Sequence, residues 1–292
     1  MRISTRAAVA TVVVIALAAI VAPFVGARAP ASIGDVVGAR LLAPLSHDPA
    51  GAFHLFGTDR LGRDLLARTL LAGRISLAVG IAGALLAGAL GVVVGAVAGW
   101  NRGAADRALM AMTDALLAIP RLVLLLLCVA LWEPNLRTVV IVLAATGWMG
   151  VARLTRAEVV AARGRPYVDA ARALGARPGR TLWRQVLPNA LGPALVATAM
   201  GVGSAIMLEA GLSFLGLGVQ PPAASWGNMI AAGRDVVVTA PWVSLVPGLA
   251  VVIVTMCATI IGDAVRDALA GKRPVVAQRT RIVTTSRGPA VN

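Results

Sequence analysis

The stretch YVDAARALGARPGRTLWRQVLPNA, residues 167–190, places arginines and helix-ending residues inside a chain that is otherwise mostly Ala, Val, Leu and Gly. Pro166 suits the first turn of a helix, where the N–H that proline lacks would have no partner. Gly175 supplies the left-handed residue that commonly ends a helix. We therefore predict one short helix from Pro166 to Gly175 and a second that starts at Pro178 and ends before Pro188.

The first of these helices carries one narrow apolar face. Its apolar residues follow the i, i+3, i+4, i+7 spacing, and they are Tyr167, Ala170, Ala171 and Leu174. On the second helix, Leu182, Trp183 and Val186 are expected to turn toward the membrane, while the arginines of the stretch stay in water. The pattern leaves two interpretations open: a surface hairpin held against lipid headgroups, or a docking element for a cytoplasmic partner.

The composition of the whole chain indicates a membrane protein. Hydrophobic residues make up 58% and charged residues only 14%, which is far more apolar than a soluble domain. The net charge of +14 is typical of nucleic-acid binders, but with 4% aromatic residues and arginines lying between apolar runs, we expect no nucleic-acid partner. Cys128 and Cys257 lie in apolar stretches and are interpreted as small buried side chains rather than a disulfide framework.

Six stretches approach the length of about 20 apolar residues that a transmembrane helix needs. In chain order they lie at 7–27, 75–101, 108–132, 136–154, within 186–233, and at 236–262. The third contains Asp114 and Arg121 and the fifth contains Glu209, charges that are costly inside a bilayer. The sequence therefore predicts an all-α integral membrane protein with six transmembrane helices.

The distribution of basic residues predicts the orientation. With a cytoplasmic N-terminus, 18 basic residues fall on the cytoplasmic side and eight outside, as the positive-inside tendency requires. Both termini and the loop 153–190 are then cytoplasmic. Six arginines in the external stretch 28–74 run against the tendency. The first 29 residues also resemble a secretory signal, with Ala27 and Ala29 in a cleavage-like pattern, and cleavage would not change the orientation of later spans.

Three regions follow. Residues 1–74 are predicted to hold the first transmembrane helix and an external segment, 75–265 the transmembrane core, and 266–292 a disordered cytoplasmic tail. Within the external segment, TDRLGRD (58–64) predicts an amphipathic helix on the outer membrane surface with Thr58 as N-cap, and direct contact with the solute is the alternative. The stretch GVQPPAASWGNM (218–229) predicts an external turn and a short re-entrant segment, with Trp226 at the membrane interface.

Three motifs carry a family resemblance. DAARALG (169–175), followed after nine residues by QVLP (185–188), resembles the EAA loop of binding-protein-dependent ABC importers, with Asp169 in place of the usual Glu. FGTDRLGRDLLARTLLAGRISLAVG (56–80) and LEAGLSFLGLGVQPPAASWGNMI (208–230) resemble the C-type permease subunits of dipeptide, oligopeptide and nickel importers. The resemblance covers roughly residues 55–265.

The resemblance implies a permease subunit in the cell membrane that imports dipeptides or oligopeptides, or alternatively nickel or another small solute. It implies as partners a second homologous permease in a heterodimer, two cytoplasmic ATPase subunits, an external substrate-binding protein and membrane lipid. The chain itself would bind no cofactor, because the ATPase subunits use the ATP. The coupling residues that it implies in the cytoplasmic loop are Tyr167, Asp169, Ala170, Ala171, Leu174, Gly175, Leu187 and Pro188.

Other classes of function fit the sequence less well. An ATPase P-loop needs a lysine after its second glycine, and the only lysine is Lys272, followed by Arg273. No H-E-x-x-H motif exists, so we expect no enzyme. His47 and His54 are interpreted as solvated loop residues, so we expect no metal site, with a metal site in the external segment as the alternative. A stand-alone secondary transporter is the main competitor, because such proteins place charges at mid-membrane; the candidate path residues are Asp114, Arg121 and Glu209.

Overall fold

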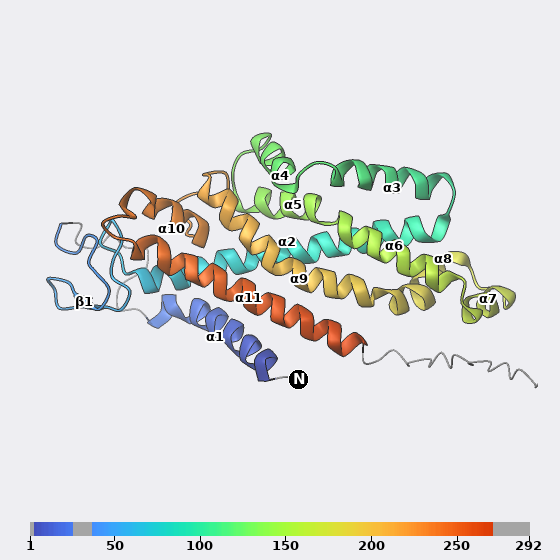
Figure 1. Cartoon of the computed structure of the whole chain (residues 1–292), viewed down its shortest axis with the longest axis horizontal. Helices are drawn as coiled ribbons and strands as arrows, with labels where there is room; N and C mark the ends of the chain where they lie inside the picture. The colour runs from blue at the N-terminus through green and yellow to red at the C-terminus, as the bar shows by residue number, and fades with distance from the viewer. Residues whose placement is uncertain (1–2, 26–36, 271–292) are drawn as a thin grey trace, which may run out of the picture.

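The computed structural model describes residues 3–25 and 37–270, and most of them form a bundle of long helices (Figure 1). The bundle contains α1 (Ile3–Val25), α2 (Leu65–Asn101), α3 (Ala104–Leu117), α4 (Arg121–Ala130), α5 (Leu136–Gly147), α6 (Met149–Arg163), α9 (Leu187–Phe214) and α11 (Trp242–Ala270). The shorter elements are α7 (Pro166–Ala173), α8 (Pro178–Thr181), the π-helical turn η1 (Leu182–Val186), α10 (Trp226–Gly233) and the 3-10 turn η2 (Arg234–Val236). Strands β1 (Ser46–His47) and β2 (Phe53–His54) pair antiparallel, with Ser46 opposite His54.

The six predicted spans correspond to four continuous helices and two bent pairs. By length and composition, α1, α2, the continuous stretch Pro178–Phe214 and α11 can each cross a membrane. The pair α3 and α4 bends by 91°, and the pair α5 and α6 by 41°. Pro120 explains the first bend, because a proline disfavours helical geometry in the residue before it. The third and fourth spans are therefore broken rather than straight.

Helix α2 forms the centre of the bundle and packs against α5, α6 and α9. Its glycines allow the neighbouring backbone to approach closely. A Cβ added at Gly91 would lie 2.6 Å from the Trp148 carbonyl oxygen, and one at Gly95 would lie 2.3 Å from the Ala152 carbonyl oxygen. Small residues on membrane helices serve this kind of contact. The predicted core boundary at residue 75 falls inside α2, which begins ten residues earlier because the Asp64 side chain caps it by accepting from Ala67 N–H.

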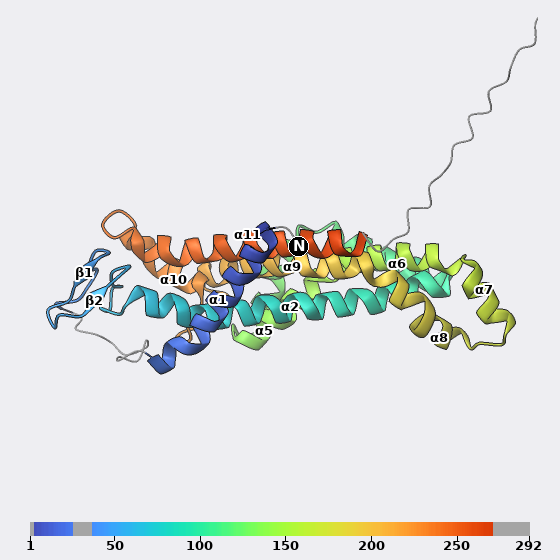
Figure 2. The same ribbon diagram turned by 90° about the horizontal axis from the view of Figure 1, so that it is seen from below.

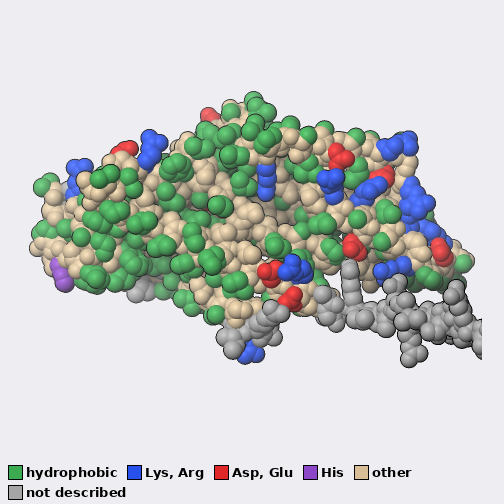
Figure 3. Space-filling view, in the orientation of Figure 1, with side chains coloured by type: hydrophobic (Ala, Val, Ile, Leu, Met, Phe, Trp, Pro, Cys, Tyr) green, Lys and Arg blue, Asp and Glu red, His purple; other side chains and the backbone are tan. Residues whose placement is uncertain are grey.

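The two ends of the bundle differ in structure and charge. The segment 37–64 and α10 lie at one end, and α7 and α8 lie at the other (Figures 1 and 2). On the face drawn in Figure 3, basic side chains gather mainly toward the end that carries α7, while apolar side chains dominate the rest. Exposed large apolar residues occur along the long helices, including Leu85 on α2, Met207 on α9 and Met256 on α11. An apolar belt between two polar ends is typical of a protein surrounded by lipid.

The predicted amphipathic helix at 58–64 is wrong. The segment is a compact turn in which Gly57 and Gly62 adopt positive φ and Thr58 bridges to Asp64. The Asp59 carboxylate accepts the backbone N–H groups of Leu61 and Arg63, which replaces the hydrogen bonds of a helix. The helix therefore begins only at Leu65.

The predicted fifth span, within 186–233, ends at Phe214, and α10 is a separate short helix. A capping box starts α10: the Ser225 hydroxyl accepts from Asn228 N–H and the Asn228 side chain accepts from Ser225 N–H. Trp226 is not an interface anchor, because its side chain is 1% exposed and its indole N–H donates to the Thr69 carbonyl oxygen of α2 at 2.9 Å. The predicted tail beyond residue 270 and the cleavage-like pattern at Ala27 and Ala29 lie outside the described residues.

Candidate functional site

Helix α7 has the predicted ends. Arg165 is extended, and Pro166 opens the helix at its first turn. At the other end Gly175 adopts φ +77°, its N–H donates to the Arg172 carbonyl, and the Ala176 N–H donates to the Ala171 carbonyl. This pair of bonds is a Schellman motif, which satisfies carbonyl groups that the helix end would leave free. The glycine stop predicted from the sequence is therefore confirmed.

One face of α7 is free and the other is packed. Leu174 is 88% exposed, Tyr167 is 36% exposed, and Ala170 and Asp169 are also exposed. Ala171, in contrast, is buried together with Val168. The predicted apolar face therefore needs correction at one position: Ala171 holds the helix to its own chain, and the free apolar face consists of Tyr167, Ala170 and Leu174. The sequence did not identify Val168 as a packed residue, because the spacing of Val168 and Ala171 is as regular as the spacing of Tyr167, Ala170 and Leu174.

The packed face joins α7 to the ends of α2 and α6. Val168 belongs to an apolar cluster with Val159 of α6 and Leu182 of η1. The Arg172 guanidinium lies 5.4 Å from the ring centroid of Trp100 near the end of α2, and Arg163 donates to the Trp100 carbonyl oxygen at 2.8 Å. A cation over an indole ring and a charged donor at a helix C-terminus are both favourable contacts. Arg172 therefore joins α7 to α2, and Arg163 joins α6 to the same residue of α2.

The second half of the hairpin runs into the membrane without a break. The predicted helix end before Pro188 is wrong: α8, η1 and α9 form one continuous helix from Pro178 to Phe214. The π-helical turn, in which Leu187 N–H donates to the Leu182 carbonyl, widens the helix just before Pro188. In this wider turn the N–H at position 188 would have no α-helical acceptor. Pro188, which has no N–H, therefore fits the first turn of α9 without the loss of a hydrogen bond. Leu187 is buried and Pro188 is exposed.

Glu209 lies inside the chain rather than on a path. Its carboxylate is 0% exposed and accepts from the Ser76 hydroxyl at 2.9 Å and the Ser213 hydroxyl at 2.7 Å. Each serine oxygen in turn accepts a backbone N–H, from Trp226 and from Val219 respectively. This network, which we call the Glu209 network, satisfies a buried carboxyl group and joins α2, α9 and α10. The prediction that Glu209 lines a translocation path is therefore corrected to a structural role.

The other two predicted path residues lie on the bent pair of α3 and α4. Asp114 faces Arg153 of α6, with 3.5 Å between Oδ1 and Nε, beside a cavity of about 220 Å³ that Met110 and Arg156 also line. Arg121 begins α4 and reaches a separate cavity of about 40 Å³. The structure thus places Asp114 at an open surface hollow and Arg121 at a separate small cavity, and Glu209 lines neither of them.

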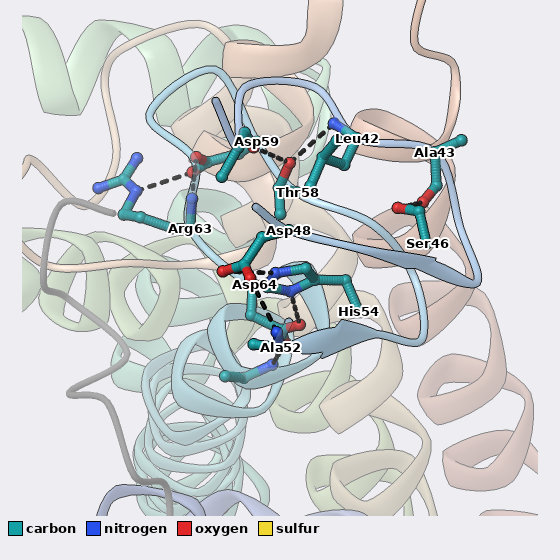
Figure 4. A network of polar contacts seen from close by, with 12 residues as sticks. Leu42, Ala43, Ser46, Asp48, Ala52, His54, Thr58, Asp59, Arg63 and Asp64 are labelled. Carbon is teal, nitrogen blue, oxygen red and sulfur yellow. Dashed lines mark hydrogen bonds and ion pairs between the residues drawn. The ribbon is translucent and has the colours of Figure 1, made fainter. Parts of the chain in front are cut away.

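The segment 37–64 is a polar cap that its own side chains hold together (Figure 4). The Thr58 hydroxyl donates to the Ala39 carbonyl and accepts from Leu42 N–H. The Asp59 carboxylate pairs with Arg63 at 2.8 Å and also with Arg68. Burial opposes the ionisation of Asp59, but the backbone N–H of Arg63 and the charges of Arg68 and Arg63 outweigh it, so its pKa lies below the usual value.

The two histidines of this cap do not converge. His54 Nδ1 lies 2.8 Å from Asp64 Oδ2, and its other ring nitrogen lies 3.7 Å from Asp48 Oδ2. His47 is exposed and packs instead against Phe53, with ring centroids 5.3 Å apart. Over residues 3–25 and 37–270, no group of three or more His, Cys, Asp or Glu side chains is arranged to hold a metal ion.

The known proteins that this chain resembles are membrane components of transport systems, in agreement with its apolar helical bundle. The model of the family described as "Binding-protein-dependent transport system inner membrane component" matches residues 91–273. A peptide transport system permease protein of Brucella suis is 39% identical over 268 residues, which are 92% of this chain and 88% of the relative. The oligopeptide transport system permease protein OppC of Bacillus subtilis is 38% identical over 221 residues, 76% of this chain and 72% of the relative.

A solved structure shares the fold. In the inward-facing MetNI methionine ABC transporter, one chain aligns with a TM-score of 0.57 at 19% identity, over 70% of this chain and 97% of that chain. At this identity the match supports the arrangement of the helices and carries no information on the solute.

Proposed function

The chain belongs to the family of inner-membrane components of binding-protein-dependent transport systems, and from this premise we propose that it is the permease subunit of an ATP-driven importer of peptides. The peptide assignment is supported by the relatives in Brucella and Bacillus, which are named as peptide and oligopeptide permeases. Its role is transport through the membrane, with ATP hydrolysis left to partner subunits. A second permease subunit and an external binding protein would complete the importer.

The observation that carries this proposal is the free face of α7. Tyr167, Ala170 and Leu174 are exposed at the tip of the molecule, beyond the apolar belt, on a helix with fixed ends. Three exposed apolar residues on one face of this helix favour contact with a partner protein over contact with water. We infer that this face docks on a cytoplasmic ATPase and that the α7 end of the bundle is cytoplasmic.

The connections of α7 support a coupling role. Arg172 of the hairpin lies over the Trp100 ring of α2, and the hairpin continues into α9 without a break. A displacement of α7 by the ATPase would therefore act on two central membrane helices at once. A headgroup-bound hairpin would not need these connections.

Leu174→Glu tests the docking assignment. Because Leu174 is 88% exposed, the substitution should leave insertion and thermal stability unchanged. It should reduce the amount of ATPase that copurifies with the tagged chain and abolish ATP-dependent uptake of a tripeptide in proteoliposomes. Arg180→Ala, an exposed change in the same hairpin, is the matched control. Undiminished copurification and uptake with Leu174→Glu would remove the α7 face as a docking surface, and uptake without ATP or ATPase would indicate a secondary transporter.

A further inference from the structure

Arg121 is the first residue of α4 and lies at the bend between α3 and α4. Its guanidinium reaches a cavity of about 40 Å³ whose other walls come from α2, α5, α6 and α9. These walls are formed mainly by small side chains, and the residues that line the cavity include Gly83, Gly88, Gly147, Ala197 and Gly201. Of the residues that line this cavity, Arg121 is the one that carries a charge.

The cavity lies at mid-height of the bundle. Gly83 is the central residue of α2 (Leu65–Asn101), and Gly201 is next to the centre of α9 (Leu187–Phe214). A charge at this depth is far from both polar ends of the bundle. The middle of the bilayer is where the insertion of an arginine is most costly. A lipid-facing role gives no reason to keep a guanidinium there.

The described residues leave this guanidinium without a partner. They give it no hydrogen bond and no ion pair, and its Nε is buried without an acceptor. The arginines of α6 differ, because Arg156 forms a bidentate pair with Asp106 and Arg153 faces Asp114. Charged groups inside a membrane normally pair, so an unpaired one indicates that its partner comes from outside the chain.

The room around the guanidinium is built into the packing. A Cβ added at Gly147 would lie 2.9 Å from Arg121 Nη2, so the glycine leaves space for the charged group. The hydroxyl of Thr198, which also lines the cavity, donates to the Ala194 carbonyl of its own helix. The guanidinium is therefore the donor that the cavity offers to a ligand.

Building on the proposed function, we propose that Arg121 binds the C-terminal carboxylate of the peptide as it passes through the permease. A guanidinium presents two parallel N–H groups that match the two oxygens of a carboxylate. The free carboxylate is common to all linear peptides, so one arginine among small side chains binds them without selecting their side chains. A lipid phosphate or an acidic side chain of the second permease is the alternative partner.

The test compares two peptides and two permeases in proteoliposomes that contain the complete importer. Uptake of trialanine and of its C-terminal amide is measured with the wild type and with Arg121→Gln. For each permease we take the ratio of trialanine uptake to amide uptake. The same binding protein delivers both peptides in both cases, so its preference for one peptide cancels when the wild-type ratio is divided by the Arg121→Gln ratio. We expect Arg121→Gln to reduce uptake of the free acid roughly 10-fold or more, the size of a lost charged hydrogen bond, and to leave uptake of the amide nearly unchanged.

Two further variants keep the charge. Arg121→Lys should restore part of the uptake of the free acid, because it keeps a positive charge at this position. Gly147→Ala should displace the guanidinium and lower uptake of the acid, while Gly150→Ala, with no atom within 4 Å of the added Cβ, should not. Assembly of each complex is checked by size-exclusion chromatography.

The outcomes separate the two proposals. Equal losses for the acid and the amide with Arg121→Gln would assign the arginine to an acidic partner residue or a lipid phosphate and overturn the inference. Equal uptake by wild type and Arg121→Gln would overturn it as well. If the wild-type importer takes up neither peptide, the proposed function itself fails.

Discussion

Gly175 is the residue whose backbone matters most for the position of α7. Its φ of +77° is unfavourable for any residue with a Cβ, although no atom lies within 4 Å of a Cβ added there. Gly175→Val should therefore cost about 1 to 2 kcal/mol through backbone strain rather than collision, and it should change the direction in which the chain leaves α7.

We expect Gly175→Val to insert normally and to lose ATP-driven uptake of peptides in proteoliposomes. Gly179→Val is the matched control, because Gly179 lies in the same hairpin with an ordinary φ and an equally open surrounding. Normal uptake with Gly175→Val would show that the exact position of α7 does not matter.

Glu209 should act on stability more than on transport. Glu209→Leu removes the carboxylate that joins the hydroxyls of Ser76 and Ser213 inside the bundle, which costs about 1 to 3 kcal/mol. We expect a lower melting temperature in detergent, with Met207→Leu, on the exposed side of the same helix, as a neutral control. An unchanged melting temperature with Glu209→Leu would mean that the Glu209 network does not stabilise the bundle.

At the scale of elements, the polar cap of residues 37–64 should respond to pH through Asp59. Because the pKa of Asp59 is lower in the folded cap than its usual value of 3.8, its ionisation stabilises the folded state. This stabilisation is fully present above about pH 4 and is lost as the pH falls through the lower folded-state pKa.

Asp59→Asn should therefore make the cap more sensitive to trypsin at pH 7 and flatten the fall in melting temperature of the whole protein below pH 4. Asp235→Asn is the control, because Asp235 is largely exposed and pairs with Arg60 at the surface. The same loss of stability on acidification in wild type and Asp59→Asn would contradict the role given to Asp59.

At the scale of the whole molecule, the proposed orientation places α7 in the cytoplasm and the cap outside. Single cysteines are placed at Leu174, in the α7 hairpin, and at Val238, at the opposite end of the bundle, after Cys128 and Cys257 have been replaced. Both positions are open to solvent, with exposed fractions of 88% and 92%. In intact cells an impermeant maleimide should label the Val238 position and not the Leu174 position. The reverse pattern would invert the orientation, and with it the docking assignment.

The sequence predicted those features that neighbouring residues determine. Pro166 and Gly175 define the ends of α7 because a first-turn proline and a left-handed glycine act within one helical turn. Apolar length likewise predicted the candidate membrane spans, which in the described residues are four continuous helices, or six if each bent pair is one span. Which face of α7 is free did not follow, because the spacing of Val168 and Ala171 is as regular as that of Tyr167 and Leu174, and only packing against α6 decides between them.

Contacts between distant segments were not predictable from the sequence. Glu209 was interpreted as a path residue and Trp226 as an interface anchor, and both are buried against α2. Their partners, Ser76 and Thr69, are small polar residues in an apolar run that give no signal of their own. Asp59 likewise pairs with Arg63 and Arg68 only because of the turn at 57–64, which requires the positive φ of Gly57 and Gly62.

The long sequence separation within the Glu209 network also has a consequence for synthesis of the chain. Ser76 meets Glu209 across 133 positions and the Trp226 N–H across 150. At about 5 to 20 residues per second, the ribosome needs roughly 7 to 30 s to make that intervening chain. Throughout this interval α2 lies in the bilayer without these partners, and its Ser76 hydroxyl can donate to a carbonyl one turn earlier in its own helix. The joining of α2 to α9 and α10 is therefore a late step of biogenesis, which can be completed only after Trp226 has left the ribosome.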